Sequence, residues 1–184
     1  MTVGDPREEV IQHLPPLRAF AMSLTQESSA ADDLVQDTIE KAWINFDKFE
    51  PGTNLRAWLF TILRNTFYSD RRKRRREVAD VDGAHAAGLA EKPAHDGRLA
   101  MRDFRAAFQQ LPDEQREALI LVGAGGFAYE EAAEMCGCAL GTIKSRANRG
   151  RRRLAELLGL EEGEEMLIED RAAVGVLSSK PPAT

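Results

Sequence analysis

Two clusters of basic side chains are the residues of this chain that could do chemistry, although its formal net charge is −5. Residues 51–76 carry eight basic groups and one acidic group, and residues 140–153 carry six basic groups and no acidic group. Clustered ammonium and guanidinium groups bind phosphates, and polar side chains among them can reach the edges of bases. The two clusters therefore favour a protein that binds nucleic acid.

The first cluster combines aromatic and basic residues. In RNTFYSDRRKRRRE, residues 64–77, Phe67 and Tyr68 precede a run of six basic side chains at 71–76. Rings that stack on bases, beside cations that hold the backbone, suit single-stranded nucleic acid. A solvated helix end stabilised by the helix macrodipole, or a nuclear localisation signal, would have the same composition. The second basic cluster favours the nucleic-acid interpretation.

The second cluster lies on the later of two predicted helices. A short helix at about 129–136, a turn that contains Gly137 and a longer helix at about 140–158 match the helix-turn-helix plan, whose second helix enters the major groove. The alternative is an ordinary bundle with a solvated basic helix, but the absence of acidic residues from 140–153 argues against it. The polar and basic side chains opposite the apolar stripe of this helix are Thr142, Lys144, Ser145, Arg146, Asn148 and Arg149.

No set of residues has the spacing of a catalytic or metal site. The histidines, at 13, 85 and 95, lie in unrelated segments, and no glycine-rich phosphate loop occurs. Zinc needs about four ligands, which Cys136 and Cys138 alone cannot supply, and these two are too close for an unstrained disulfide. We therefore expect a protein that is not an enzyme, with reduced cysteines and with no metal or cofactor.

Helical periodicity predicts the elements that position these side chains. The apolar stripe from Ala31 to Phe46, which includes Trp43, predicts one helix with a buried face. The outer face of this helix carries Asp33, Gln36, Asp37, Glu40 and Lys41. A weaker helix at about 7–24 precedes it, and Pro15-Pro16 is expected to interrupt that helix.

A further helix is predicted after the break at Pro51-Gly52, with Asn54 as its N-cap. Its inner stripe is expected to be Leu55, Trp58, Leu59, Ile62, Leu63 and Phe67. Its outward residues are expected to be Arg56, Phe60, Arg64, Asn65 and Tyr68.

The chain is expected to be all-α, with two small helical domains. Residues 1–77 form the first domain and residues 98–160 the second, and 78–97, rich in Ala and Gly, are expected to be a flexible linker. Residues 161–184 are acidic at their start and are expected to be a disordered tail. The N-terminus lacks the apolar core of a secretory signal, so we expect a cytoplasmic protein that does not insert into membranes.

Three segments resemble regions 2 and 4 of an extracytoplasmic-function (group 4) RNA polymerase sigma factor. They are DDLVQDTIEKAW, FDKFEPGTNLRAWLFTILRNTFYSDRRKRRRE and YEEAAEMCGCALGTIKSRANRGRRRL. The resemblance covers about 10–160, with both blocks in the family's order and separation. The sequences of these segments are most similar to those of the general stress response sigma factors of alphaproteobacteria.

The resemblance implies a role for each surface. It implies that region 2 recognises and melts the −10 promoter element, that the helix-turn-helix of region 4 reads the −35 element as duplex, and that the acidic helix face binds core polymerase. The implied −10 residues are Asn54, Arg56, Asn65, Tyr68, Arg71, Arg72, Arg74 and Arg75. The implied −35 residues are Thr142, Lys144, Ser145, Arg146, Asn148 and Arg149. The implied polymerase-binding residues are Asp33, Gln36, Asp37, Glu40 and Lys41.

The implied function is to direct core RNA polymerase, through its β′ and β subunits, to the promoters of stress-response genes, under the control of a small anti-sigma protein. The main alternative is an interaction protein that imitates a sigma factor and titrates the anti-sigma protein. Such a mimic has no need of DNA-reading cations, which this chain retains. Two departures from the family pattern are Ala128, at a position where a hydroxyl usually caps the helix, and Gly150, inside the recognition helix.

Overall fold

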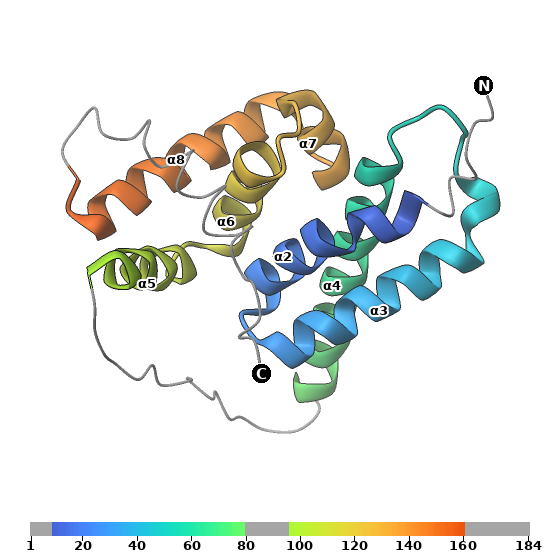
Figure 1. Ribbon diagram of the computed structural model, residues 1–184, viewed down its shortest axis with the longest axis horizontal. Helices are drawn as coiled ribbons and strands as arrows, with labels where there is room; N and C mark the ends of the chain where they lie inside the picture. The colour runs from blue at the N-terminus through green and yellow to red at the C-terminus, as the bar shows by residue number, and fades with distance from the viewer. Residues whose placement is uncertain (1–8, 80–95, 161–184) are drawn as a thin grey trace.

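The computed structural model describes residues 9–79 and 96–160, and all regular structure within these two segments is helical (Figure 1). This confirms the all-α class. Most of the predicted linker and the whole of the predicted tail at 161–184 lie outside the described residues.

The first unit is a set of three packed α-helices with short connecting turns. Its elements are η1 (Val10–His13), α2 (Leu14–Thr25), α3 (Ser28–Ile44), η2 (Phe46–Lys48) and α4 (Leu55–Ala79). Pro15 and Pro16 lie in the first turn of α2, where a helix needs no backbone donor. The expectation that these prolines interrupt a helix is therefore wrong, because they start one after a 3₁₀ turn.

The N-cap predicted for α4 is confirmed. The backbone N–H of Ala57 donates a hydrogen bond to Asn54 Oδ1 at 3.1 Å, so the side chain satisfies one of the free donors at the helix start. The N-cap fixes the direction in which α4 leaves the loop.

Two aromatic residues lie elsewhere than the periodicity predicted. Trp43, expected in the core, is 49% exposed, whereas Phe60, expected to face outward, is 2% exposed. Phe60 stacks on Phe20 of α2 with ring centroids 5.0 Å apart and meets Phe127 of the second unit edge-on at 5.1 Å. The outward prediction failed because α4 packs against helices on two sides, and a single-stripe pattern allows for only one.

The second unit contains the helix-turn-helix. Its elements are α5 (Asp96–Gln109), α6 (Asp113–Leu119), the π-helical turn η3 (Ile120–Ala124), α7 (Tyr129–Cys136) and α8 (Leu140–Leu158). Gly137, with φ of +60°, ends α7 in the left-handed conformation and turns the chain towards α8.

The two departures from the family pattern have local structural explanations. A Cβ at Gly150 would lie 3.0 Å from Leu119 Cδ1, so glycine lets α8 approach α6 closely. At the start of α7, Ala128 has no side-chain acceptor, but its backbone N–H donates to Glu131 Oε2 at 2.9 Å. Half of a capping box is therefore retained without a hydroxyl.

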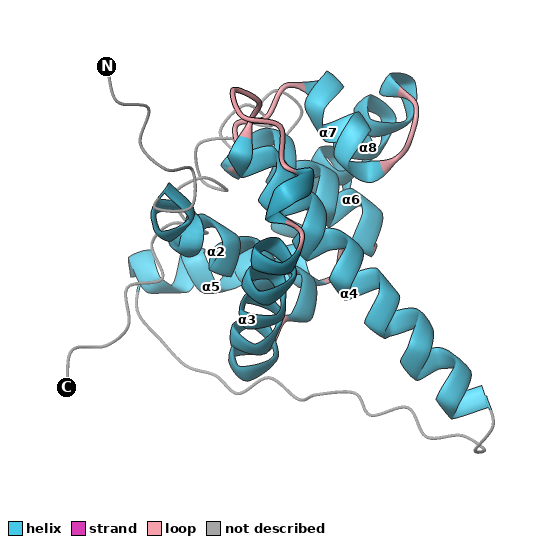
Figure 2. Cartoon of the chain, turned by 90° about the vertical axis from the view of Figure 1, so that its right-hand side faces the viewer, coloured by secondary structure: helices cyan, strands magenta, loops and turns pink. Residues whose placement is uncertain are grey.

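The two units pack against each other and share one apolar core. Helix α4 contacts α7, and α2 contacts α6, so segments far apart in the sequence lie side by side (Figure 1). The C-terminal part of α4 extends beyond the other helices (Figure 2), and its residues from Arg71 to Glu77 are exposed. The long helix therefore presents one part to the second unit and another part to solvent.

Candidate nucleic-acid interface

The residues that the resemblance assigns to the −10 element lie on different faces of α4. Two of them, Tyr68 and Arg71, share one face with Arg64 by i, i+4, i+7 spacing, and this face is turned towards the second unit. Arg64 itself is not among the residues that the resemblance assigns. Asn65 borders an open groove on another face, beside α3. Arg72, Arg74 and Arg75 are exposed on the projecting part of the helix.

The face turned towards the second unit meets a buried carboxylate, Glu117 of α6. Arg64 Nε lies 2.7 Å from Glu117 Oε1, and the Tyr68 hydroxyl donates to Oε2 at 3.4 Å. The Glu117 side chain is only 1% exposed, and this burial raises the pKa of its carboxyl group despite the opposing charge of Arg64. Glu117 is thus an acid that depends on Arg64 to offset the cost of removing its charge from water.

Burial also shifts the pKa values of two neighbouring groups at this contact. Burial raises the pKa of the Tyr68 hydroxyl above its ordinary value, and it raises the pKa of the Cys136 thiol to about 12. Both groups therefore stay protonated near neutral pH, and Cys136 is a buried, unreactive thiol rather than a nucleophile.

Three further −10 candidates contact the second unit. Asn54 Nδ2 donates to Glu131 Oε1 at 2.9 Å, and Arg71 pairs with Asp113. The guanidinium carbon of Arg56 lies 4.7 Å from the centroid of the Phe127 ring, a cation–π distance, and burial lowers the pKa of Arg56. With Tyr68, four of the eight predicted −10 residues are engaged by α6, α7 or the turn between them.

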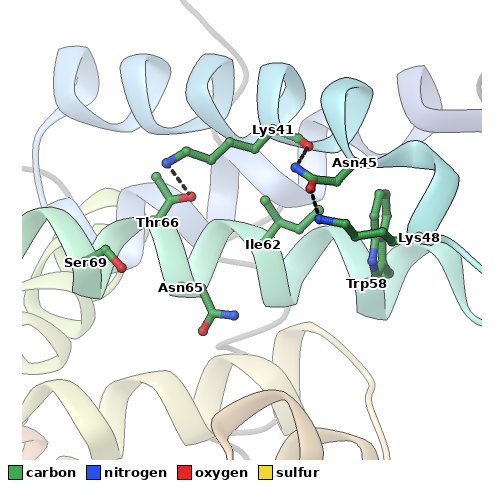
Figure 3. A pocket seen from close by; sticks show the side chains of 8 residues that line it. All are labelled: Lys41, Asn45, Lys48, Trp58, Ile62, Asn65, Thr66 and Ser69. Atoms are coloured by element: carbon green, nitrogen blue, oxygen red, sulfur yellow. Dashed lines mark hydrogen bonds between the residues drawn. The ribbon is translucent and has the colours of Figure 1, made fainter.

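An open groove of about 300 Å³ lies between α3 and α4, on the side of α4 away from α7 (Figure 3). Lys41 Nζ donates to Thr66 Oγ1 at 3.1 Å, and Lys48 Nζ donates to Asn45 Oδ1 at 2.5 Å. The groove is lined by Lys41, Asn45, Lys48, Trp58, Ile62, Asn65, Thr66 and Ser69. A flat aromatic wall beside two amines and two amides can hold a base and its phosphate.

The sequence patterns did not predict most of the residues that line the groove. Trp58 and Ile62 were assigned to the inner stripe of α4, but they are only half-buried and line the groove. Trp58, Ile62, Asn65 and Ser69 have the spacing of one helix face, which was the signal available. Lys41 was grouped with the acidic face of α3, yet its amine lies in the groove, and its assignment to polymerase stays a prediction.

The −35 candidates lie on α8, which is held on the second unit by Ile143, Ala147 and Leu154, all 0% exposed. Lys144, Ser145, Asn148 and Arg149 are exposed and Thr142 is half-buried. Arg146 differs, because its side chain is 16% exposed and its Nη2 lies 2.9 Å from Glu114 Oε1 of α6. The structure therefore brings most of this set together on one surface and turns Arg146 towards α6.

The candidates for polymerase binding form an exposed face of α3. Asp33, Gln36, Asp37, Glu40 and Lys41 are all exposed, opposite the buried Leu34, Thr38 and Ala42. Asp33 and Asp37 also border a cleft of about 430 Å³ between α3, α4 and α6. The charged residues that line this cleft are Glu27, Asp33, Asp37, Asp70, Arg71, Arg74, Asp113 and Arg116.

The described residues, 9–79 and 96–160, offer no metal site and no membrane span. Those residues contain no group of three or more His, Cys, Asp or Glu side chains placed to hold a metal ion. In the same part of the chain, no helix is both long enough and apolar enough to cross a membrane.

Two family models match the chain in the order that the resemblance implied. The model described as Sigma-70 region 2 matches residues 10–77, and that described as Sigma-70, region 4 matches residues 101–154. The first match contains both the groove and the α4 cations, and the second contains the helix-turn-helix.

Several known proteins are similar over most of the chain. The ECF RNA polymerase sigma factor EcfG of Rhodopseudomonas palustris is 54% identical over 171 residues, which cover 92% of this chain and 94% of that protein. The ECF RNA polymerase sigma factor SigE of Mycolicibacterium smegmatis is 33% identical over 163 residues, which cover 85% of this chain and 63% of that protein.

A solved structure agrees with these relatives. The sigma factor RpoE from Bartonella quintana, determined in complex with the anti-sigma factor NepR, has 56% identity and a TM-score of 0.76. The match covers 87% of this chain and 100% of that one. The chain therefore belongs to the extracytoplasmic-function sigma factors, the RNA polymerase subunits that direct transcription initiation to specific promoters.

Proposed function

We propose that this sigma factor starts transcription at stress-response promoters by holding the melted −10 strand in the groove between α3 and α4 while α8 reads the −35 duplex. The observation that carries the proposal is the presence of two basic surfaces with different chemistry. One combines an aromatic wall with amines, and the other is a helix covered with hydrogen-bonding side chains.

The groove suits a single strand. A base that stacks on Trp58 would lie beside Lys48, and the amide of Asn65 and the amine of Lys41, further along the groove, would contact the neighbouring nucleotide. Arg72 and Arg75, exposed on the projecting part of α4, would continue the contact along the backbone. Base stacking and phosphate contacts together hold a strand whose pairing has been broken.

The surface of α8 suits a duplex. Lys144, Ser145 and Arg149 are exposed near the N-terminal half of the helix, the part that reads base edges in helix-turn-helix proteins. Arg152 and Arg153 follow on the same exposed helix, where they would contact phosphates.

The acidic face of α3 is the proposed docking surface for the β′ subunit of core polymerase. Asp33, Asp37 and Glu40 are exposed there and can face a basic partner without rearrangement of the helix core. We further propose an anti-sigma protein of the NepR type as a regulator, because the Bartonella relative is bound to one. A cytoplasmic location follows from dependence on polymerase and promoter DNA.

Run-off transcription tests the proposal. Purified core polymerase with this chain should give discrete start sites on a promoter library, and core polymerase alone should not. Lys48→Ala, which removes an amine from the groove, should reduce transcription from duplex templates but have a smaller effect on a template with an unpaired −10 segment. A chain that yields no promoter-dependent start would contradict the proposal, and a chain that also fails to bind core polymerase would favour a sigma mimic.

A further inference from the structure

We propose that carboxylates of the second unit bind the DNA-facing side chains at the start of α4 and along it, within the same chain. The two units must then separate before α4 can engage promoter DNA with its whole surface. This inference rests on the proposed function, because it concerns the regulation of the same surface. Three carboxylates carry it, at Asp113 and Glu117 of α6 and at Glu131 of α7.

Glu117 occupies the centre of the contact. Its carboxylate accepts from Arg64 Nε at 2.7 Å and from the Tyr68 hydroxyl at 3.4 Å, and its side chain is 1% exposed. A guanidinium binds a carboxylate and a phosphate oxygen through the same N–H groups. While Glu117 holds Arg64, no phosphate can bind the same donor.

The contact extends along α4 on both sides of this centre. One turn before Glu117 on the same face of α6, Asp113 pairs with Arg71. Towards the start of α4, Glu131 accepts from Asn54 Nδ2 at 2.9 Å. The carboxylates therefore contact α4 and its N-cap between Asn54 and Arg71. They bind three of the eight predicted −10 residues, Asn54, Tyr68 and Arg71.

The same short helix also engages the −35 surface. Glu114, next to Asp113, lies on the other side of α6, and its Oε1 is 2.9 Å from Arg146 Nη2 of α8. Asp113, Glu114 and Glu117 thus neutralise cations from both DNA-facing surfaces. Helix α6 acts as an internal substitute for the phosphate backbone.

The two units could pack against each other without these acidic contacts. The rings of Phe60 and Phe127, 5.1 Å apart, already provide an apolar contact between them. The acidic contacts add a competition, because closure and nucleic acid use the same donors. The affinity for DNA is then reduced in proportion to the fraction of molecules that are open.

A charge reversal at Glu117 in the full-length chain tests the inference. Glu117→Arg places a cation against Arg64, whereas Glu134→Arg makes the same change of charge at an exposed position of α7. Small-angle X-ray scattering measures the radius of gyration, and fluorescence anisotropy measures binding of a random pool of single-stranded DNA of about 12 nucleotides.

We expect Glu117→Arg to enlarge the radius of gyration and to tighten binding of the DNA pool. The gain is about tenfold if about a tenth of the wild-type molecules are open. Glu134→Arg should keep the compact form and show a much smaller gain, which measures the general effect of charge. Arg64→Glu combined with Glu117→Arg restores an attractive pair, and it should return the radius of gyration to the wild-type value. Circular dichroism establishes that each variant is folded.

Three results would overturn the inference. One is a folded Glu117→Arg variant that stays compact, and another is a wild-type chain that is already extended. The third is a variant that opens with no more gain in DNA binding than Glu134→Arg. Run-off transcription by the wild-type chain separates this inference from the proposed function. If the chain transcribes while Glu117→Arg stays compact, only the internal competition is wrong.

Discussion

Glu117 is an acid held between two helical units, with Arg64, Tyr68 and Cys136 around its carboxyl group. Burial raises its pKa above the ordinary value of 4.5, and the attraction of Arg64 offsets this only in part. The folded chain therefore binds this proton more tightly than the unfolded chain does. Tyr68 and Cys136 do not ionise in the same pH range, because burial raises the pKa of both.

The raised pKa predicts how stability depends on pH. Between pH 4.5 and the raised pKa, the folded state holds more protons than the unfolded state, so the free energy of unfolding falls as pH rises. Glu117→Gln lacks this ionisation. The wild type should therefore lose stability relative to Glu117→Gln as pH rises through this interval, and the difference should then stay constant. Urea unfolding of both proteins across this pH range measures the difference in their free energies of unfolding. A difference that does not depend on pH would show that the pKa of the Glu117 carboxyl group is not raised.

Gly150 offers a second prediction for a single residue. Alanine at this position gains about 1 kcal/mol in helix propensity, but its Cβ would meet Leu119 at 3.0 Å and Gln115 Cβ at 3.3 Å. Because overpacking a core typically costs about 1–3 kcal/mol, we expect Gly150→Ala to destabilise the chain by about 1 kcal/mol in urea unfolding. The control is Gly141→Ala, also on α8, where an added Cβ meets nothing within 4 Å. If Gly150→Ala proved as favourable as the control, close packing would not explain this glycine.

Helix α4 shows how much of an element a sequence pattern can predict. Periodicity correctly placed Leu55, Leu59 and Leu63 in the core, and turn chemistry correctly placed the cap at Asn54. The pattern assumes one buried face and one solvated face. Helix α4 instead has an inner face, a face against the second unit and a face along the groove.

For the candidate sites too, the sequence predicts some features and not others. The basic character and order of α4 and α8 follow from local composition, so the sequence located both helices that are proposed to face DNA. The pairing of Arg64 with Glu117 joins residues 53 positions apart, and the pairing of Arg71 with Asp113 joins residues 42 positions apart. Nothing local specifies such pairs, because they depend on how the two units pack. The groove was missed for the same reason, since its walls come from separate helices.

The two basic helices should respond differently to the loss of one cation. Lys144 is exposed on α8, so Lys144→Ala should weaken binding of a −35 duplex by about 1–3 kcal/mol if the contact is to a base edge, and should relax preference at that position. Arg75→Ala, on the projecting end of α4, should weaken binding of all sequences alike and lower the salt slope by about one. Binding titrations with base-substituted promoters at several salt concentrations measure both effects. A change of base preference in Arg75→Ala, without one in Lys144→Ala, would reverse these assignments.

Charge is segregated by surface in this molecule, and the net charge of −5 conceals this segregation. Cations occupy α4 and α8, and acids occupy the outer face of α3 and the two sides of α6 that meet α4 and α8. In the closed arrangement the acids of α6 face cations of the same chain. The acids on the outer face of α3 remain exposed and available to a partner.

The exposed acidic face of α3 is expected to bind core polymerase through its charge. Asp37 and Glu40 lie opposite the buried Thr38 and Ala42, so reversing their charges should change stability by less than about 0.5 kcal/mol each. Against a basic partner surface, each reversal replaces attraction with repulsion, which can cost several kcal/mol. We therefore expect the Asp37→Arg and Glu40→Arg double variant to fold normally and to fail to bind core polymerase.

Circular dichroism and pull-down of core polymerase measure the two halves of this prediction. The matched control reverses two exposed acids of the second unit, Asp103→Arg with Glu156→Arg, and should retain core binding because the same change of charge falls outside α3. Loss of binding in both double variants would mean that overall charge, rather than this face, governs docking. A folded Asp37→Arg and Glu40→Arg variant that binds core polymerase as tightly as the wild type would remove the docking role from α3. Polymerase would then have to contact the first unit through a surface other than the outer face of α3.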